Sequence, residues 1–378
     1  MRTANVVMGR RIRVLVVDDS PTIRRHLADQ LARDRELEVV GTAADPYVAR
    51  DMIQALRPDV LTLDVQMPGM DGLTFLEKLM RLRPMPVVMV SSFTREGCET
   101  TLRALELGAV DFVPKAGLRS APGTADGIAD LARKIKGAAG ARLQPVPVAI
   151  PRASEGRGAA SPRFIPRLRA DRLVAVGAST GGTEAIRMLL AGMPPDSPPV
   201  VIVQHMPRQF TRAFAEHCDR ECAISVAEAG DGDEVRPGQA LIAPGDRHMT
   251  ICRAGARLVV RVKRERLVNG VRPSVDVLFL SVAETVGAGS VGILLTGMGA
   301  DGARGLLAMK LAGARTIAQD AVTSVVFGMP KAAIALGAAE HVLPLARIGA
   351  KALELAGSPV SGAFDLTPTG GGRDALDG

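Results

Sequence analysis

Residues 173–182, LVAVGASTGG, place a short apolar strand before a glycine-rich turn that carries one serine, Ser179. Residues 177–181 fit the Gly-x-Ser-x-Gly elbow, in which small neighbours allow a sharp turn and leave the hydroxyl exposed. The pattern at 183–190 predicts a helix whose free N–H groups face that turn, where developing negative charge is stabilised. A plain tight connection or a dinucleotide-binding loop fits the same glycines, so the elbow alone leaves three interpretations open.

The polar residues after the following strands favour a hydrolase. Residues 199–204 predict the next strand, and it ends in His205, where a dinucleotide site would have an acidic residue. A further strand, 291–295, leads through a glycine-rich turn to Asp301. The carboxyl ends of parallel strands meet at one edge, so these residues and Ser179 converge. Because a serine nucleophile needs a base and a carboxylate that orients the base, we predict a Ser179–His205–Asp301 triad.

His341 offers an alternative base. It would restore the Ser-Asp-His order of the α/β-hydrolases. However, His341 precedes its apolar run, residues 342–345, which places it at the opposite edge of the sheet. We therefore assign the role of base to His205.

The composition limits the other classes of function. The chain has 378 residues, 47% hydrophobic and 23% charged, which predicts two or three globular domains. No apolar run approaches the roughly 18 residues that span a membrane, and residues 1–11 lack a signal-peptide core. We therefore expect a cytoplasmic protein without membrane insertion, whose four cysteines stay reduced. His217, Cys218 and Cys222 lack a fourth ligand, so we predict no structural zinc.

The net charge of +7 does not by itself indicate nucleic-acid binding. Much of the excess lies in the Arg-, Pro-, Gly- and Ala-rich stretch 138–170, which is typical of a solvated, flexible linker. With one Tyr, no Trp and no finger or helix-turn-helix spacing, we expect no nucleic-acid partner.

The N-terminal third alternates apolar strands, at 14–17, 60–63, 87–90 and 110–113, with helical patterns. This alternation predicts a parallel sheet with helices on both faces. Polar residues stand directly after these strands: Asp18, Asp19, Asp64, Ser91 and Lys115. Three converging carboxylates repel one another, so Mg²⁺ is the expected counter-charge. With the metal and Lys115 neutralising charge, Asp64 is placed to attack a phosphoryl group.

These residues stand in VLVVDDS, LTLDVQMPGMDG, VVMVSS and DFVPK, which resemble the receiver domain of response regulators. The resemblance implies that a chemotaxis histidine kinase phosphorylates Asp64. It implies that Asp18, Asp19, Asp64 and the Gln66 carbonyl hold Mg²⁺. Ser91 and Lys115 would sense the phosphate. Phe112 occupies the aromatic switch position of that family, although an ordinary core aromatic fits the position equally well.

A second set of motifs, VGASTGG, QHMP, RPSVDVLF, LLTGMGADG and VVFGMPKAA, resembles the catalytic domain of the CheB family of protein-glutamate methylesterases. The resemblance implies a nucleophilic Ser179, a basic His205, an orienting Asp301 and an oxyanion hole that includes the Met298 N–H. It also implies demethylation of glutamate methyl esters, and deamidation of glutamines, on methyl-accepting chemoreceptors. The esterase site would need no cofactor. We interpret Ser274 or Asp276, at the start of a predicted helix, as its cap.

We therefore expect an α/β protein with a flavodoxin-like receiver at 11–137 and a doubly wound esterase domain at 171–357. A flexible linker at 138–170 and a disordered tail at 358–378 complete the expected organisation. The receiver would cover or misalign the serine edge until Asp64 is phosphorylated. Two rival hypotheses remain open: a hydrolase for another ester or amide, and a nucleotide-binding regulator without catalysis.

Overall fold

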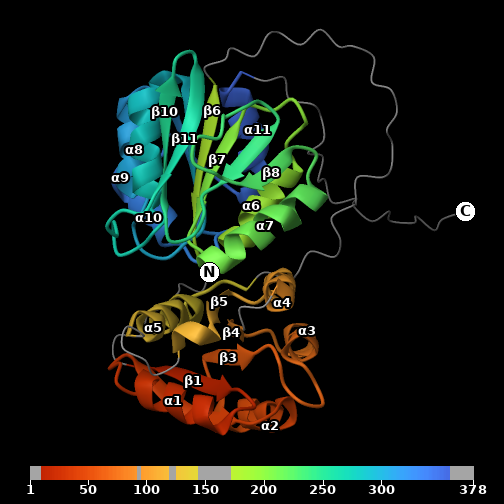
Figure 1. Ribbon diagram of the computed structural model, residues 1–378. Coiled ribbons are helices and arrows are strands. Elements are labelled where there is room, and N and C mark those ends of the chain that lie inside the picture. Colours follow the sequence, from red (N-terminus) through yellow and green to blue (C-terminus); the bar gives the residue numbers. More distant parts are fainter. Residues whose placement is uncertain (1–9, 92–94, 119–124, 144–171, 358–378) are drawn as a thin grey trace, which may run out of the picture.

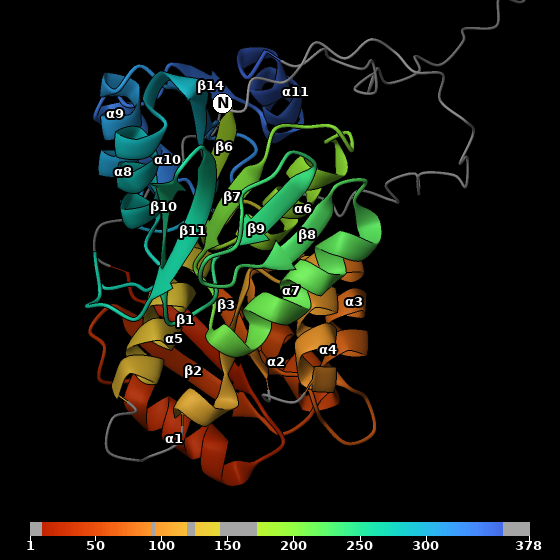
Figure 2. The same cartoon turned by 45° about the horizontal axis from the view of Figure 1, so that its top comes forward.

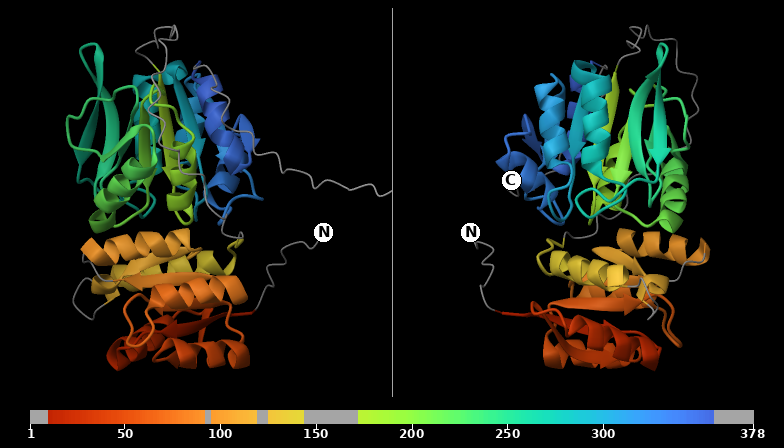
Figure 3. Two further views of the ribbon diagram at one scale, coloured as in Figure 1. Left: turned by 90° about the vertical axis from the view of Figure 1, so that its right-hand side faces the viewer. Right: turned by 60° about the vertical axis from the view of Figure 1, so that its left-hand side comes forward.

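The computed structural model describes residues 10–91, 95–118, 125–143 and 172–357. They form two α/β units stacked on each other (Figures 1 and 3). Most of the predicted linker, 144–170, and the predicted tail, 358–378, lie outside the described residues, as does Ser92, the last residue of the VVMVSS motif.

The N-terminal unit is built on a five-stranded parallel sheet in the order β2-β1-β3-β4-β5. This is the flavodoxin-like strand order. Its strands are β1 (Ile12–Val17), β2 (Leu37–Ala43), β3 (Val60–Asp64), β4 (Val87–Ser91) and β5 (Asp111–Pro114). Its helices are α1 (Pro21–Leu31), α2 (Pro46–Leu56), α3 (Gly72–Leu82), α4 (Arg95–Glu106) and α5 (Ala125–Ala139), with a 3-10 turn, η1 (Lys115–Leu118). The predicted receiver fold is confirmed.

Alternation along the central strands supplies an apolar core on each face of this sheet. In β1, Leu15 and Val17 pack in the cluster that contains the buried side chains of α2, α3 and α4. Val14 and Val16 point the other way, into the cluster of α1 and α5. Successive side chains of a strand point to opposite faces, so this double-sided pattern requires helices on both faces.

The C-terminal unit has a seven-stranded parallel sheet in the order β14-β13-β12-β6-β7-β9-β8. The strands are β6 (Leu173–Ala178), β7 (Val200–Gln204), β8 (Ser225–Glu228), β9 (Gln239–Ile242), β12 (Ser290–Leu294), β13 (Arg315–Gln319) and β14 (His341–Leu343). An antiparallel pair, β10 (His248–Ala254) and β11 (Arg257–Lys263), lies outside this sheet. The predicted doubly wound α/β class is confirmed.

Helices cover both faces of this second sheet. They are α6 (Gly182–Ala191), α7 (Arg208–Glu221), α8 (Val275–Thr285), α9 (Ala303–Leu311), α10 (Met329–Ala335) and α11 (Leu345–Leu355), with a 3-10 turn, η2 (Gly287–Gly289). Buried side chains of α6, α7 and α11 share one core cluster. Those of α8, α9 and α10 share another with the β10-β11 pair.

The start of the predicted linker is corrected by the structure. Helix α5 continues to Ala139, and Ala138 is fully buried, so residue 138 belongs to the receiver core. Beyond it, the Arg142 backbone N–H donates to the Val325 carbonyl of the C-terminal unit at 3.0 Å. The sequence predicted a linker from residue 138 because small side chains such as those of Ala138 and Ala139 do not indicate which surface buries them.

The two units meet along α4, β5 and α5 of the receiver. In Figure 2, α7 of the C-terminal unit runs beside α4, and these two helices are in contact. The residues of the C-terminal unit that contact the receiver include Thr180, Phe210, Met298 and Val325. The first three follow strands β6, β7 and β12, so the receiver lies on the carboxyl edge of the sheet.

Candidate active site

Strand β6 is the point at which the order of the second sheet reverses. The chain passes from β6 to β7 on one side and later returns to β12 on the other side. In open α/β sheets, ligands bind outside the carboxyl ends of the strands at such a switch point. Ser179 directly follows β6, His205 directly follows β7 and Asp301 follows β12. The structure thus places the three predicted residues around one switch point.

The serine turn is fixed by hydrogen bonds on both sides of the hydroxyl. The Ser179 N–H donates to the Thr296 carbonyl at 3.0 Å, and the Gln204 side-chain amide donates to the Ser179 carbonyl at 2.8 Å. Gly297 permits this close approach, since a Cβ there would lie 2.8 Å from the Ser179 Cβ. Gly181 adopts a positive φ of 74°, which glycine tolerates because it has no Cβ.

His205 and Asp301 form a direct pair. The His205 Nε2 lies 2.9 Å from an Asp301 carboxylate oxygen; the Asp301 side chain is 5% exposed and the His205 side chain is 9% exposed. An ionised carboxylate only accepts hydrogen bonds, so Nε2 carries the proton and Nδ1 is the nitrogen with a lone pair. The His205 backbone N–H donates to Ala178, the residue before the serine.

Asp301 is held as a carboxylate. Burial alone would raise its pKa, but hydrogen bonds from His205 and then from Ser274 and Asn269 outweigh burial and lower the pKa to about 2. Asp301 is therefore ionised across the physiological range, as an orienting residue must be.

Two of these partners were missed in the sequence. The Ser274 hydroxyl donates to Asp301 at 2.7 Å, and it also caps α8 by accepting from the Val277 N–H. The Asn269 amide donates to Asp301 at 2.6 Å. Ser274 is thus the predicted cap, and it also fixes the acid. The Asn-Gly pair at 269–270 is a turn signal, but it does not reveal which carboxylate the turn approaches.

Met298, predicted as an oxyanion donor, lies in the loop after β12 and faces the receiver. A Cβ added at Gly137 of α5 would lie 3.1 Å from the Met298 sulfur. The role of its N–H stays a prediction. The Met298 side chain places the loop after β12 against α5 of the receiver.

The acidic site of the receiver is assembled as expected. Carboxylate oxygens of Asp18, Asp19 and Asp64 lie within 4.8 Å of one another. Burial, and to a smaller extent Asp18, raise the pKa of Asp64 to about 6 against the opposing effect of Lys115. Lys115 forms ion pairs with Asp64 and Asp18.

This donor set fits a hard divalent cation. The buried Oδ2 of Asp18 accepts no well-aligned hydrogen bond within the described residues, although the Lys115 ammonium lies 3.1 Å away. Carboxylate oxygens are the ligands that Mg²⁺ prefers. Gln66, whose carbonyl is the remaining predicted ligand, follows β3, and its N–H donates to Asp64 at 3.2 Å.

Ser91, the predicted phosphate sensor, is engaged with α4. Its hydroxyl donates to the Gly97 carbonyl at 3.2 Å and accepts from the Thr101 hydroxyl at 2.6 Å. Lys115, the second predicted sensor, is already at Asp64. Of the two predicted sensors, Lys115 therefore contacts Asp64, whereas Ser91 contacts α4.

A buried polar contact joins the receiver to the serine turn. The Thr180 hydroxyl donates to the Asp111 carboxylate of β5 at 2.6 Å. Lys134 of α5 lies 2.9 Å from the same carboxylate and balances its charge. The receiver thus holds the residue next to Ser179.

Phe112 packs directly against the C-terminal unit. Its ring centroid lies 4.4 Å from that of Phe210, at an interplanar angle of 47°. Both rings are buried. The predicted switch aromatic is therefore an interface residue, which neither of the two sequence interpretations anticipated.

An ion-pair network lies at the rim of the interface. His217 of α7 lies 2.7 Å from Glu106 of α4. Glu106, His217 and Glu221 also have a spacing that could suit a metal ion. However, three arginines contact these side chains, and they already supply positive charge: Arg103, Arg187 and Arg220. We therefore interpret this cluster as an interdomain ion-pair network.

The cysteines near His217 are not activated. Burial raises the pKa of the Cys218 thiol well above its usual value, and burial raises that of Cys222 to about 11. Such thiols remain protonated, whereas metal ligation requires the thiolate.

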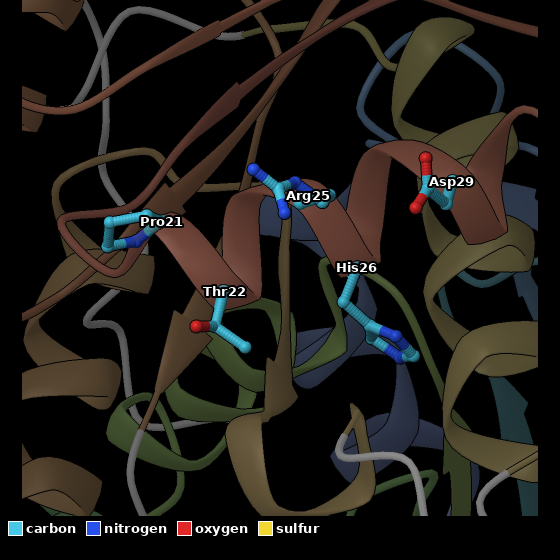
Figure 4. A pocket seen from close by; sticks show the side chains of 5 residues that line it. All are labelled: Pro21, Thr22, Arg25, His26 and Asp29. Atoms are coloured by element: carbon cyan, nitrogen blue, oxygen red, sulfur yellow. The ribbon is translucent and has the colours of Figure 1, made fainter.

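One hollow of about 300 Å³ lies away from the serine edge, along α1 of the receiver (Figure 4). Side chains of one helix line it: Pro21, Thr22, Arg25, His26 and Asp29. Within the four described ranges, no helix is both long and apolar enough to span a bilayer.

Together, the fold and these sites define a response regulator whose output is an α/β domain with Ser, His and Asp at its switch point. The receiver-domain model of response regulators matches residues 14–120, and the CheB methylesterase model matches residues 174–352. A Pseudomonas aeruginosa protein-glutamate methylesterase/protein-glutamine glutaminase is 53% identical over 93% of this chain and 99% of its own length. A Bordetella parapertussis protein of the same description is 54% identical over 91% of this chain and 97% of its own length. The chain belongs to this CheB family.

Solved structures of single domains are also similar. The Thermotoga maritima CheB methylesterase catalytic domain is 40% identical, covers 49% of this chain and 98% of its own, and has a TM-score of 0.48. The response regulator domain of the same organism's CheB is 41% identical, covers 34% of this chain and 97% of its own, and has a TM-score of 0.32.

Proposed function

We propose that this chain hydrolyses glutamate methyl esters, and deamidates glutamines, on chemoreceptors, with Ser179, His205 and Asp301 as its catalytic triad. The observation that carries the assignment is the partly buried His205–Asp301 pair, with 2.9 Å between Nε2 and a carboxylate oxygen, beside the serine turn at the switch point of the sheet. The family relationship supports the reaction class.

The chemistry follows from the protonation of this pair. His205 Nδ1 removes the Ser179 proton as the hydroxyl oxygen attacks the ester carbonyl, and Asp301 stabilises the imidazolium that forms. The tetrahedral oxyanion is stabilised by backbone N–H groups at the turn, including that of Met298. Collapse returns the proton to the departing methoxide and releases methanol. Water then attacks the acyl-serine with His205 as base, the Ser179 oxygen leaves and takes the proton back from His205, and a glutamate carboxylate is released. A glutamine releases ammonia in the first step by the same route.

Control comes from the receiver. Asp64 attacks the phosphoryl group of a chemotaxis histidine kinase and becomes an acyl phosphate. Asp18, Asp19, Asp64 and the Gln66 carbonyl would hold Mg²⁺, which when bound neutralises charge on the phosphoryl oxygens. Lys115 is already placed at the same carboxylate.

The interface suggests how the signal reaches the serine. In the unphosphorylated chain, Asp111 holds Thr180 and Phe112 packs on Phe210, so the receiver closes the edge where substrate must enter. A phosphate on Asp64 would draw Ser91 away from Gly97 and Thr101 of α4. Loss of these Ser91 contacts would let α4 shift. Because α4 contacts α7 of the C-terminal unit, a shift of α4 loosens the interface between the two units. The cytoplasmic location expected from the sequence stays a prediction.

The test is methanol release from receptor membranes carrying labelled methyl esters, together with labelling by an active-serine phosphonate. Wild type should release methanol and take up the phosphonate at Ser179. Ser179→Ala should do neither, and His205→Ala should be slow in both assays, whereas His341→Ala should match wild type. Loss of activity in His341→Ala with retention in His205→Ala would reject the assignment.

A further inference from the structure

The loop between β11 and α8, residues 264–274, reaches the triad from the solvent side. It contains an Asn-Gly turn in which Asn269 and Gly270 both have positive φ angles, 53° and 75°. Val268 and Val271 exchange two backbone hydrogen bonds across this turn. Positive φ at both central positions is the type I′ pattern, for which Asn-Gly is a preferred sequence.

The turn brings the amide of one exposed residue, Asn269, into contact with two buried acids. The Asn269 amide nitrogen donates to Asp301 at 2.6 Å and to Asp276 at 2.8 Å. Both carboxylates are nearly inaccessible, 5% and 4% exposed. An amide nitrogen has two hydrogens, one for each acid. The opposite orientation of the amide would put its oxygen against two carboxylates, so the acids themselves fix which way the side chain points.

The loop is anchored independently of this contact. His248 is buried, and its Nδ1 accepts from the Ser274 N–H at 3.1 Å while its Nε2 lies 2.9 Å from the Arg266 carbonyl. The His248 ring thus connects β10 to residues on both sides of the turn, Arg266 and Ser274. Asn269 therefore meets the acids from a preset position.

We propose that Asn269 is a positioning residue for the esterase reaction, whose amide holds Asp301 in the orientation that His205 requires. The inference rests on the proposed function, because it assigns Asp301 its role in the triad. Asp276 is fixed separately by the Gly305 N–H at 2.7 Å, so it serves as a rigid second anchor for the amide. The bridge also screens two like charges that would otherwise repel each other in a buried site.

Asn269 both forms the turn and donates hydrogen bonds to the acids. A substitution can separate these two roles. Glycine at position 269 keeps a sequence compatible with a type I′ turn but removes the amide. We compare Asn269→Gly with wild type in the phosphorylated full-length chain, using methanol release and the rate of phosphonate labelling at Ser179. Leu267→Ala is the matched control, since Leu267 belongs to the same loop and is 58% exposed.

We expect Asn269→Gly to lower kcat and the labelling rate by about 10- to 100-fold, the range expected for one lost hydrogen bond to a charged group. KM should stay unchanged, and Leu267→Ala should retain the wild-type kcat. In an Asp301→Ala background, Asn269→Gly should cost nothing more, because the residue acts only through Asp301.

An unchanged kcat in Asn269→Gly would overturn the inference, as would an equal loss in the Asp301→Ala background, which indicates a general structural effect. The two levels of proposal remain distinguishable. If Asp301→Ala itself keeps full activity, the triad and this inference both fall. If Asp301→Ala is slow but Asn269→Gly is fast, only the inference falls.

Discussion

Replacing Phe112 by leucine is expected to weaken the contact between the receiver and the serine edge, and so to raise basal esterase activity. Phe112 lies on β5, and its ring packs on Phe210 of α7 at a centroid distance of 4.4 Å. Leucine keeps an apolar side chain inside the receiver but removes the ring contact between the domains. The substitution touches none of the proposed catalytic residues, so an altered rate reports on the interface.

The magnitude follows from the ring pair. Aromatic pairs contribute about 0.5–1.5 kcal/mol beyond their buried area, which corresponds to an approximately 2- to 13-fold change in a closed–open equilibrium. If the closed form predominates without phosphate, basal methanol release should rise by the same factor. Activity with a phosphodonor should change little, because in the proposed mechanism phosphorylation already opens the interface.

The matched control is Phe75→Leu. Phe75 is another buried receiver phenylalanine, 7% exposed against 3% for Phe112, and it lies on α3. It should lose comparable core packing without raising the basal rate. Basal release that stays at the wild-type level in Phe112→Leu, or that rises equally in Phe75→Leu, would refute the role of this contact in holding the domains closed.

Three further outcomes are expected. Glu106→Gln, which removes the partly exposed pair with His217, should raise basal methanol release by at most about 5-fold, and raised salt should shrink the difference from wild type. Chelation of Mg²⁺ with EDTA should abolish phosphorylation of Asp64 by a small phosphodonor, measured as bound phosphate, while phosphonate labelling of the isolated domain 172–357 stays unchanged. The pKa of Asp301, about 2 in the fold against an ordinary 3.8, contributes about 2 kcal/mol of stability that is present above pH 4 and lost as the pH falls toward 2. Urea unfolding of that domain should show this loss in wild type, and Asp301→Asn should show a flatter dependence over the same pH range.

The sequence could predict the strand ends because the central strands are short apolar runs followed at once by polar residues. Ser179, His205 and the receiver acids were found in this way, and Asp301 was found through the glycine-rich turn that follows its strand, since a parallel sheet brings its carboxyl ends together. Strand β2 was missed. It pairs on one side only, and the polar Glu38 and Thr42 interrupt its apolar pattern.

Contacts between elements far apart in the chain could not be predicted. Thr180 and Asp111 are ordinary residues in their own motifs, and their hydrogen bond depends on how two domains pack. Asn269 is similar: its turn could be recognised from Asn-Gly, but its two carboxylate partners come from α8 and from the loop before α9. Local patterns identify the polar groups, whereas tertiary packing decides which of them meet.

The central claim is that phosphorylation of Asp64 controls ester hydrolysis at Ser179. Methanol release from methylated receptor membranes, measured with and without a small phosphodonor, tests it most directly. We predict that the phosphodonor raises release by wild type, leaves Asp64→Ala at its basal rate, and has no effect on Ser179→Ala, which stays at background. Equal release by wild type with and without the phosphodonor, or sustained release by Ser179→Ala, would contradict the account.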